Sequence, residues 1–198
     1  MRSFAAISAI ALLASSALAT PVSSKVARQA NGSPCFVIGQ ETLPKEVADA
    51  ATSLQNAVTC SANGVTTLSG VPDVTSGDVS FSDVDFSQAR GQSTLAFALD
   101  KFATKTPLAS TDLQFFEDSL NVYVATEVGI RSVGGNLAIK VPKFFLEFQV
   151  SRIKTAQGNP PTEAGLQVDH LRDKVTKNAA GQSKALLDQV VALAKQLK

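Results

Sequence analysis

Apolar residues follow a helical period over four segments of the chain. Within each segment they recur three or four positions apart, as they do on the buried face of an amphipathic helix. These segments are residues 42–58, 93–104, 111–135 and 162–198. Thr42 is the expected N-cap of the first helix. The pattern predicts a helix-dominant domain.

Within the last segment, Gly181 is expected to separate two helices. The segment 111–135 carries the clearest helix pattern. Its apolar stripe consists of Leu113, Phe116, Leu120, Val124 and Val128. Thr111 and Gln114 have the spacing of a capping box at its start, and glycines close its end. We therefore expect one long helix there.

Residues 64–87 show a two-residue alternation instead. Val, Leu and Phe alternate with Ser, Thr and Asp, and turn residues interrupt the pattern. This is typical of a small antiparallel β-ribbon, so the expected fold class is α+β. The alternation slips between Phe81 and Val84, which predicts a bulge near Ser82. Residues 34–39 also have the composition of a strand.

The stretch 137–153 is strongly apolar and fits two structures. As a strand, it would place on one side the alternating residues Phe144, Leu146, Phe148 and Val150. As a helix, it would begin near Pro142 and end at Gly158. Both interpretations remain open, and the positions of proline and glycine favour the helix.

Residues 1–19 have the features of a secretory signal peptide. Arg2 precedes an apolar run, and small residues fit cleavage after Ala19. Residues 20–33 are small and polar, so we expect a flexible tail, with a possible processing site after Arg28. The protein is therefore expected to be secreted and extracellular.

The remaining residues, 34–198, are expected to form a single globular domain with no strong charge imbalance. The chain has 18 Lys and Arg and 17 Asp and Glu residues, and Arg2 would leave with the signal peptide. A near-neutral chain offers no electrostatic footprint for nucleic acid or anionic lipid. We expect neither as a partner, and no transmembrane anchor after signal cleavage.

Cys35 and Cys60 are the two cysteines of the chain. In a protein bound for an oxidising compartment, two cysteines predict one disulfide bond. The pair encloses the first predicted helix and lacks the CxxC spacing of a redox pair, so the expected role is structural.

No catalytic or metal-binding motif stands out. The one histidine, His170, is expected to face water rather than act as a base. Ser151 and Lys154 match an SxxK spacing without its companion motifs. The aspartates between positions 73 and 85 suit turns better than a calcium site. We therefore expect no catalytic residue, metal or cofactor.

Tyr123, Glu127 and Arg131 follow one another at four-residue intervals on the long predicted helix. A glutamate four residues before an arginine favours an intrahelical salt bridge. The alternative is a polar mouth on a phenylalanine-lined ligand pocket. The residues of that pocket would be Tyr123, Glu127, Arg131, Phe116, Phe144 and Phe148.

Several phrases of the chain resemble one group of proteins. They are SPCF, VTC, LNVYVATEVGIRSVGGNLAIKVPKFFLEFQVSRI and HLRDKVTKNAA. Together with the short Ala/Ser-rich leader, they are similar to an uncharacterised family of small secreted proteins of filamentous ascomycete fungi. The resemblance implies a fungal source and secretion, and it implies no activity and no site residues.

Three functions follow as hypotheses. The first is a non-enzymatic secreted protein that acts at the fungal cell wall or toward a host. The second is a carrier of a small apolar ligand, in a cavity lined by the phenylalanines at 97, 102, 115, 116, 144, 145 and 148. Because the chain has no Trp and one Tyr, the same phenylalanines are needed to build a core. A hydrolase with an acid pair such as Asp100 and Glu127 is a third hypothesis.

Overall fold

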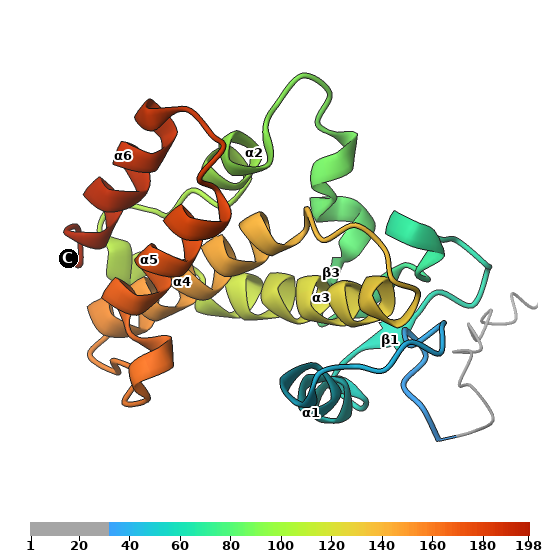
Figure 1. The fold of residues 1–198 in the computed structure, drawn as a ribbon. Helices are drawn as coiled ribbons and strands as arrows, with labels where there is room; N and C mark the ends of the chain where they lie inside the picture. Colours follow the sequence, from blue (N-terminus) through green and yellow to red (C-terminus); the bar gives the residue numbers. More distant parts are fainter. Residues whose placement is uncertain (1–31) are drawn as a thin grey trace, which may run out of the picture.

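The structure is a computed structural model that describes residues 32–198 (Figure 1). These residues form an α+β fold dominated by helices, with a small three-stranded antiparallel sheet. The helices are α1 (Lys45–Leu54), α2 (Thr94–Lys101), α3 (Leu113–Ser132), α4 (Lys140–Ala156), α5 (Val168–Asn178) and α6 (Lys184–Ala194). The expected signal peptide and nearly all of the expected tail lie outside the described residues.

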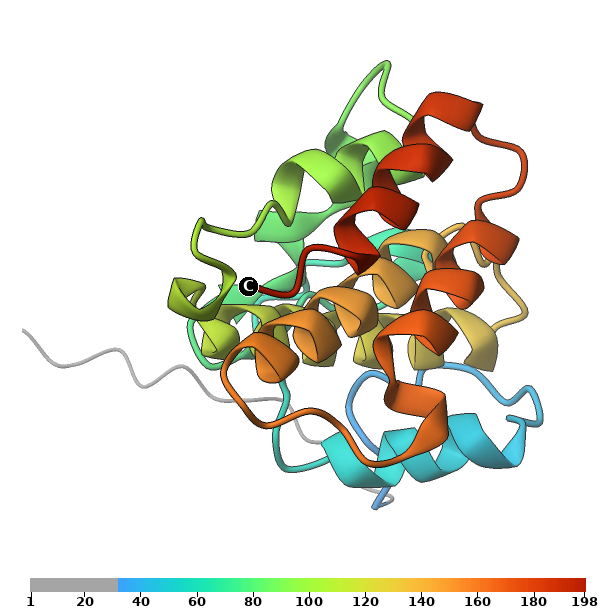
Figure 2. The ribbon, with the colours of Figure 1, turned by 90° about the vertical axis from the view of Figure 1, so that its left-hand side faces the viewer.

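A pair of long helices, α3 and α4, forms the centre of the fold. Helix α1 and the sheet pack against α3, whereas α2 and α5 pack against α4. Figure 2 shows α1 and α6 on opposite sides of this central pair. Helix α3 is therefore covered on several faces, and Ser119, Val122 and Thr126 are more buried than most of its apolar stripe. The single stripe predicted for this helix was incomplete for that reason.

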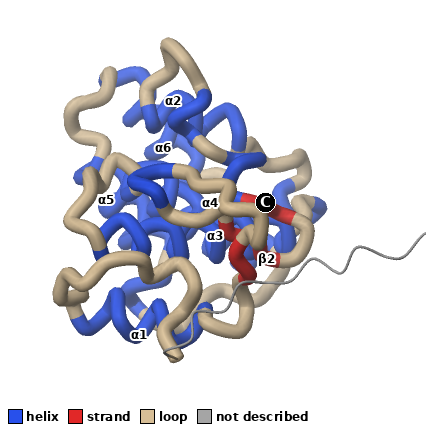
Figure 3. Tube along the Cα trace, turned by 90° about the vertical axis from the view of Figure 1, so that its right-hand side faces the viewer, coloured by secondary structure: helices blue, strands red, loops and turns tan. Residues whose placement is uncertain are grey.

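The strands are short and lie beside α3, as the red segments of Figure 3 show. They are β1 (Thr59–Cys60), β2 (Val74–Ser76) and β3 (Val79–Ser80), in the order β1-β2-β3. The ribbon predicted at 64–87 is thus present, but its first strand lies outside that range. The Ser76 hydroxyl donates to Asp118 of α3 at 2.7 Å, which fixes the hairpin on the helix.

The predicted bulge near Ser82 was wrong. The chain instead forms a 3₁₀ helix at Phe81–Val84, where Ser80 and Asp83 make a capping box. Because this short helix turns Phe81 and Val84 to the same side, both are buried. This short helix therefore explains why the two-residue alternation slips between Phe81 and Val84.

Residues 34–39 are not a strand, contrary to the sequence prediction. Their amide groups bind the end of α3 rather than a neighbouring strand. Ile38 and Gly39 donate to the Ser132 hydroxyl at 3.1 and 2.9 Å, and the Glu41 amide donates to the Ser132 carbonyl at 3.0 Å. This segment therefore docks on α3 as a loop.

Two predicted helix starts were displaced by a few residues. Helix α1 begins after Pro44, so Thr42 is not its N-cap. Helix α3 begins after Asp112, whose carboxylate accepts from the amides of the next turn. Thr111 is buried instead and accepts a bond from the Lys105 amide at 2.9 Å. Asp112 is the better cap at that point because its carboxylate is also favoured by the helix dipole.

Helix α4 confirms the helical interpretation of residues 137–153, and the strand interpretation was wrong. Pro142 lies in the first turn, where its missing N–H group is not needed. At the other end Gly158 has a φ of 85°, the left-handed conformation that terminates many helices. The alternation of phenylalanines was uninformative because α4, like α3, is buried on several faces.

The last two helices confirm the division predicted at Gly181. Arg152 of α4 holds the end of α6 in place. Its guanidinium group donates to the carbonyls of Leu193 and Gln196, both at 2.8 Å, and to the Gln149 side chain. Burial lowers the pKa of Arg152 to about 10, so the group remains a cation at neutral pH. The carbonyls at the C-terminal end of a helix carry partial negative charge, which compensates this buried cation.

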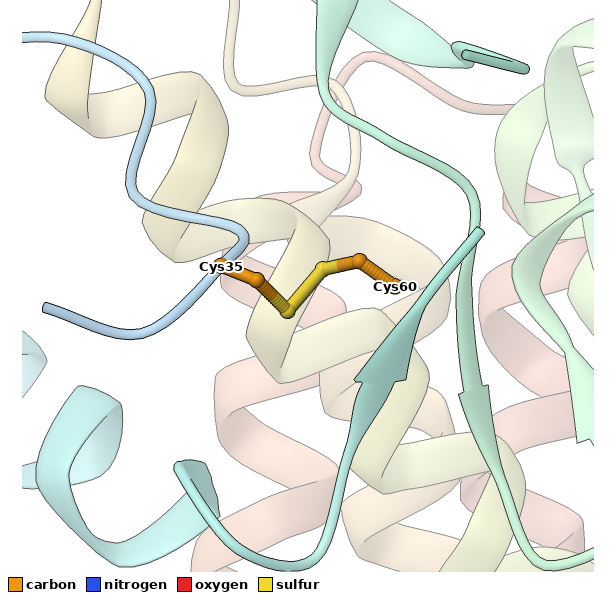
Figure 4. The surroundings of a disulfide bond; sticks show 2 residues. All are labelled: Cys35 and Cys60. Carbon is orange, nitrogen blue, oxygen red and sulfur yellow. A yellow bond between two sulfur atoms is a disulfide. The ribbon is translucent and has the colours of Figure 1, made fainter. Parts of the chain in front are cut away.

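The predicted disulfide between Cys35 and Cys60 is present (Figure 4). It joins the loop that precedes α1 to strand β1, and the Cα atoms of the two cysteines lie 6.1 Å apart. Within the described residues, no helix is long and apolar enough to cross a membrane.

Candidate functional site

Tyr123, the first residue of the predicted pocket, lies in the core. Its hydroxyl donates to the Val84 carbonyl at 2.6 Å, and its ring packs against Phe81 and Phe102, with centroids 5.1 and 5.9 Å away. Burial raises the pKa of the Tyr123 hydroxyl, so it stays neutral. Tyr123 therefore ties α3 to the sheet region and does not face a ligand.

Phe116 and Phe148 are also core residues. The Phe116 ring lies 6.5 Å from that of Phe102, and the Phe148 ring lies 6.0 Å from that of Phe145. Phe148 and Phe116 are almost completely buried. These edge and tilted contacts are typical of a packed aromatic core. The phenylalanines supply the bulk of the interior, as the lack of tryptophan required.

The salt bridge predicted between Glu127 and Arg131 is present, with 2.7 Å between Oε1 and the guanidinium group. Lys143 of α4 adds a second cation, 2.9 Å from Oε2 of Glu127. Glu127 is only 4% exposed, so this carboxylate links α3 and α4 through a mostly desolvated cluster. The sequence pattern identified the pair within the helix, but not the lysine from the next one.

Phe144 differs from the other predicted pocket residues because it is only half-buried. Three ammonium groups surround its ring: those of Lys143, Lys174 and Lys140, at 4.2, 5.2 and 6.0 Å from the centroid. Such cation–π contacts join α4 to α5. The six predicted pocket residues are thus divided among the aromatic core, an ionic cluster and a surface contact.

A groove with other lining residues lies between α3, α4 and α5. Its volume is about 730 Å³, and the loop after α4 with a short 3₁₀ helix at Ala164–Leu166 forms its outer wall. The apolar lining consists of Leu113, Leu120, Val150, Pro160, Pro161, Leu166 and Leu171. Sites for small molecules commonly have volumes of about 300–1,000 Å³ and apolar walls. This groove is the candidate functional site.

Polar side chains on one side of α4 also line the groove. Glu147 and Ser151 are one helical turn apart, and Lys154 follows in the next turn. Lys154 is paired with Glu117 of α3 at 2.7 Å. The Ser151 hydroxyl is buried and has no hydrogen-bond partner within the described part of the chain. Buried hydroxyls normally have a hydrogen-bond partner, so this one is an exception among the groove residues.

The structure also places the other sequence candidates. Lys154 cannot serve Ser151 as a base while Glu117 holds its ammonium group, which weakens the SxxK hypothesis. His170 is exposed, as predicted. Asp73 accepts bonds from the amide and hydroxyl of Ser82, as a turn aspartate does. Among residues 32–198, no group of three or more metal-ligating side chains is gathered.

Glu147 was not singled out by the sequence, because a lone glutamate in an apolar stretch has no distinctive spacing. Ser151 was noted only within the SxxK pattern. Glu147 and Ser151 line the same groove only because the loop at 157–163 and helix α5 fold back over α4. No local signal in the sequence indicates that the chain folds back at this point.

Comparison with known proteins gives a family and no further relative. The described residues form a small disulfide-bonded α+β domain. The chain belongs to the family DUF7143, a domain of unknown function, which matches residues 37–198. No curated protein and no solved structure matches the chain.

Glu127 and Glu147 are expected to affect stability with opposite dependence on pH. Burial alone would raise the pKa of Glu127, but Lys143 and Arg131 hold it below its usual value of 4.5. Burial raises the pKa of Glu147 above 4.5, and the positive charges of Lys143 and Lys174 offset this only in part. Glu127 therefore stabilises the fold above pH 4.5, and this contribution is lost as the pH falls through its folded-state pKa.

The ionised Glu147 destabilises the fold above its raised pKa, and the penalty disappears as the pH falls from that pKa to 4.5. Glu147→Gln should raise the free energy of unfolding at pH 7 and have little effect at pH 4. Glu127→Gln should lower it at pH 7 by about 2 kcal/mol, because two partly buried cations lose the charged acceptor of their hydrogen bonds. Urea denaturation at both pH values measures these changes, and effects of equal sign at pH 7 would contradict the assignment.

Proposed function

We propose that this protein is secreted and acts outside the cell as a non-catalytic binding protein, with the groove between α3, α4 and α5 as its binding site. Its source is a filamentous ascomycete fungus, and its ligand is met at the cell wall or in a host. The observation that carries the proposal is the groove itself, about 730 Å³ in volume with mainly apolar walls.

Two further observations support a binding role over hydrolysis. The acid pair considered from the sequence was Asp100 and Glu127. Glu127 is held by two cations, which lower its pKa, so it is poorly suited to donate a proton. Asp100 is exposed on α2, a helix that does not border the groove.

The phenylalanine-lined cavity of the carrier hypothesis is replaced by this groove. The rings at 102 and 116 pack against each other in the core, and so do those at 145 and 148. The groove instead uses leucine, valine and proline for its apolar walls. A carrier role is thus retained in the proposal, at a different place in the molecule.

Ligand binding is tested on protein purified from culture medium, by native mass spectrometry and by solvent extraction. Leu166→Trp should fill the groove, because Leu166 is 46% exposed on its wall and tolerates a larger side chain. Val191→Trp is the matched control, since Val191 is 37% exposed on α6, away from the groove. A stoichiometric ligand should be lost in the first variant and kept in the second. Equal retention in both would refute the groove as the site.

A further inference from the structure

The groove contains one carboxylate whose charge is poorly compensated. The Glu117 carboxylate is neutralised by Lys154 at 2.7 Å. The nearest cation to Glu147 is Lys143, at 3.7 Å, and this lysine lies closer to Glu127, at 2.9 Å. The Glu147 side chain is only 18% exposed, so water compensates its charge poorly.

A second cation near Glu147 is also engaged elsewhere. The positive charge of Lys174 on α5 favours the ionised Glu147, but its ammonium group lies 5.2 Å from the centre of the Phe144 ring. Glu127 of α3 faces the same carboxylate and opposes its ionisation. Glu147 thus has no dedicated cation among the described residues.

Ser151 supplies the second unpaired polar group, one turn further along α4. The Thr155 hydroxyl bonds back to the Ser151 carbonyl at 2.8 Å, but the Ser151 hydroxyl makes no such bond. An unsatisfied buried hydroxyl is destabilising, and a ligand group that bonds to it recovers this free energy. Residues four apart lie on the same side of a helix, so this hydroxyl and the Glu147 carboxylate form one polar spot.

The chemistry of that spot selects among ligand heads. An ammonium group has three N–H donors and a positive charge, and both a carboxylate and a hydroxyl accept such donors. A carboxylate or phosphate head would meet the negative charge of Glu147. The leucine, valine and proline side chains that line the rest of the groove suit a hydrocarbon body.

We infer that the groove binds a small amphipathic amine, with its ammonium group between Glu147 and Ser151 and its apolar body along the walls formed by α3, α5 and the loop after α4. This inference rests on the proposed function, because it names the ligand class of the same site. The ammonium group gains a charge-assisted hydrogen bond, and Glu147 gains the dedicated cation it lacks.

The test compares three probes of equal chain length: n-octylammonium, n-octanol and octanoate. Their dissociation constants are measured by calorimetry at pH 7, and amide shifts in NMR spectra locate the site. The intact protein should bind octylammonium about tenfold or more tightly than either other probe. Glu147→Gln should remove this preference and leave octanol binding within about twofold, while Ser151→Ala should reduce it in part.

Glu46→Gln is the matched control, since Glu46 is exposed on α1 and does not line the groove. It should keep the preference for the amine. Tighter binding of octanoate than octylammonium, or an unchanged preference in Glu147→Gln, would overturn the amine inference while leaving the groove as a site. If no probe shifts groove amides, and Leu166→Trp retains the natural ligand, both the inference and the proposed function are refuted.

Discussion

Gly129→Ala is expected to destabilise the domain by about 3 kcal/mol, because α3 has no room for a methyl group at this position. A Cβ atom there would lie 2.6 Å from the Phe36 carbonyl oxygen and 2.7 Å from both methyl groups of Val71. The Phe36 oxygen is part of the backbone, so it cannot move as a flexible side chain does. The segment docked on α3 would have to shift as a whole.

The measurement is the free energy of unfolding from urea denaturation at neutral pH. Gly181→Ala is the control, since a Cβ atom at Gly181, between α5 and α6, meets nothing within 4 Å. It should leave stability unchanged or raise it slightly. A change below about 0.5 kcal/mol for Gly129→Ala would mean that the close contact between α3 and the loop is absent in solution.

Removal of the disulfide is expected to have a comparable or larger effect. The double variant Cys35→Ser/Cys60→Ser should lose about 3–4 kcal/mol, because the bridge closes a loop whose ends are 25 residues apart in sequence. For a domain of this size, that loss corresponds to a fall in Tm of roughly 10 °C. Much of this loss in the free energy of unfolding arises because the unfolded chain gains conformational freedom without the bridge.

A reductant provides the control for this variant. Tris(2-carboxyethyl)phosphine should lower the Tm of the intact protein toward that of the double variant and leave the variant itself unchanged. Differential scanning calorimetry with and without reductant makes both comparisons. If the reductant affects neither protein while mass spectrometry confirms free thiols, the bridge contributes nothing to stability.

The helices were predictable because their apolar spacing is local. The first residue of each helix was harder to predict. Several polar residues stand near each start, and the cap is the one whose side chain accepts bonds from the free backbone amides of the first turn. Asp112, not Thr111, does so for α3 because Thr111 accepts a bond from the Lys105 amide. The strands were harder still, because each has only two or three residues and is held by tertiary contacts such as that between Ser76 and Asp118.

The candidate site was the part that the sequence could not reveal. Of the predicted cluster of Tyr123, Glu127 and Arg131, the salt bridge between Glu127 and Arg131 within α3 was predicted correctly. Which polar residues face a groove depends on how α3, α4 and α5 meet, and that arrangement joins residues far apart in the sequence. Glu147 and Ser151 became neighbours of a cavity only through the return of the chain after α4.

The pairing of α3 with α4 also bears on the order in which the chain folds. The two helices are joined by the short connection at residues 133–139, whereas the bond from Tyr123 to Val84 spans 39 residues and that from Arg152 to Gln196 spans 44. The entropy lost on closing a loop grows with its length, and local contacts therefore form at the earliest stage. We expect this helical hairpin to serve as a nucleus, onto which the disulfide-bonded half and the C-terminal helices condense from opposite sides.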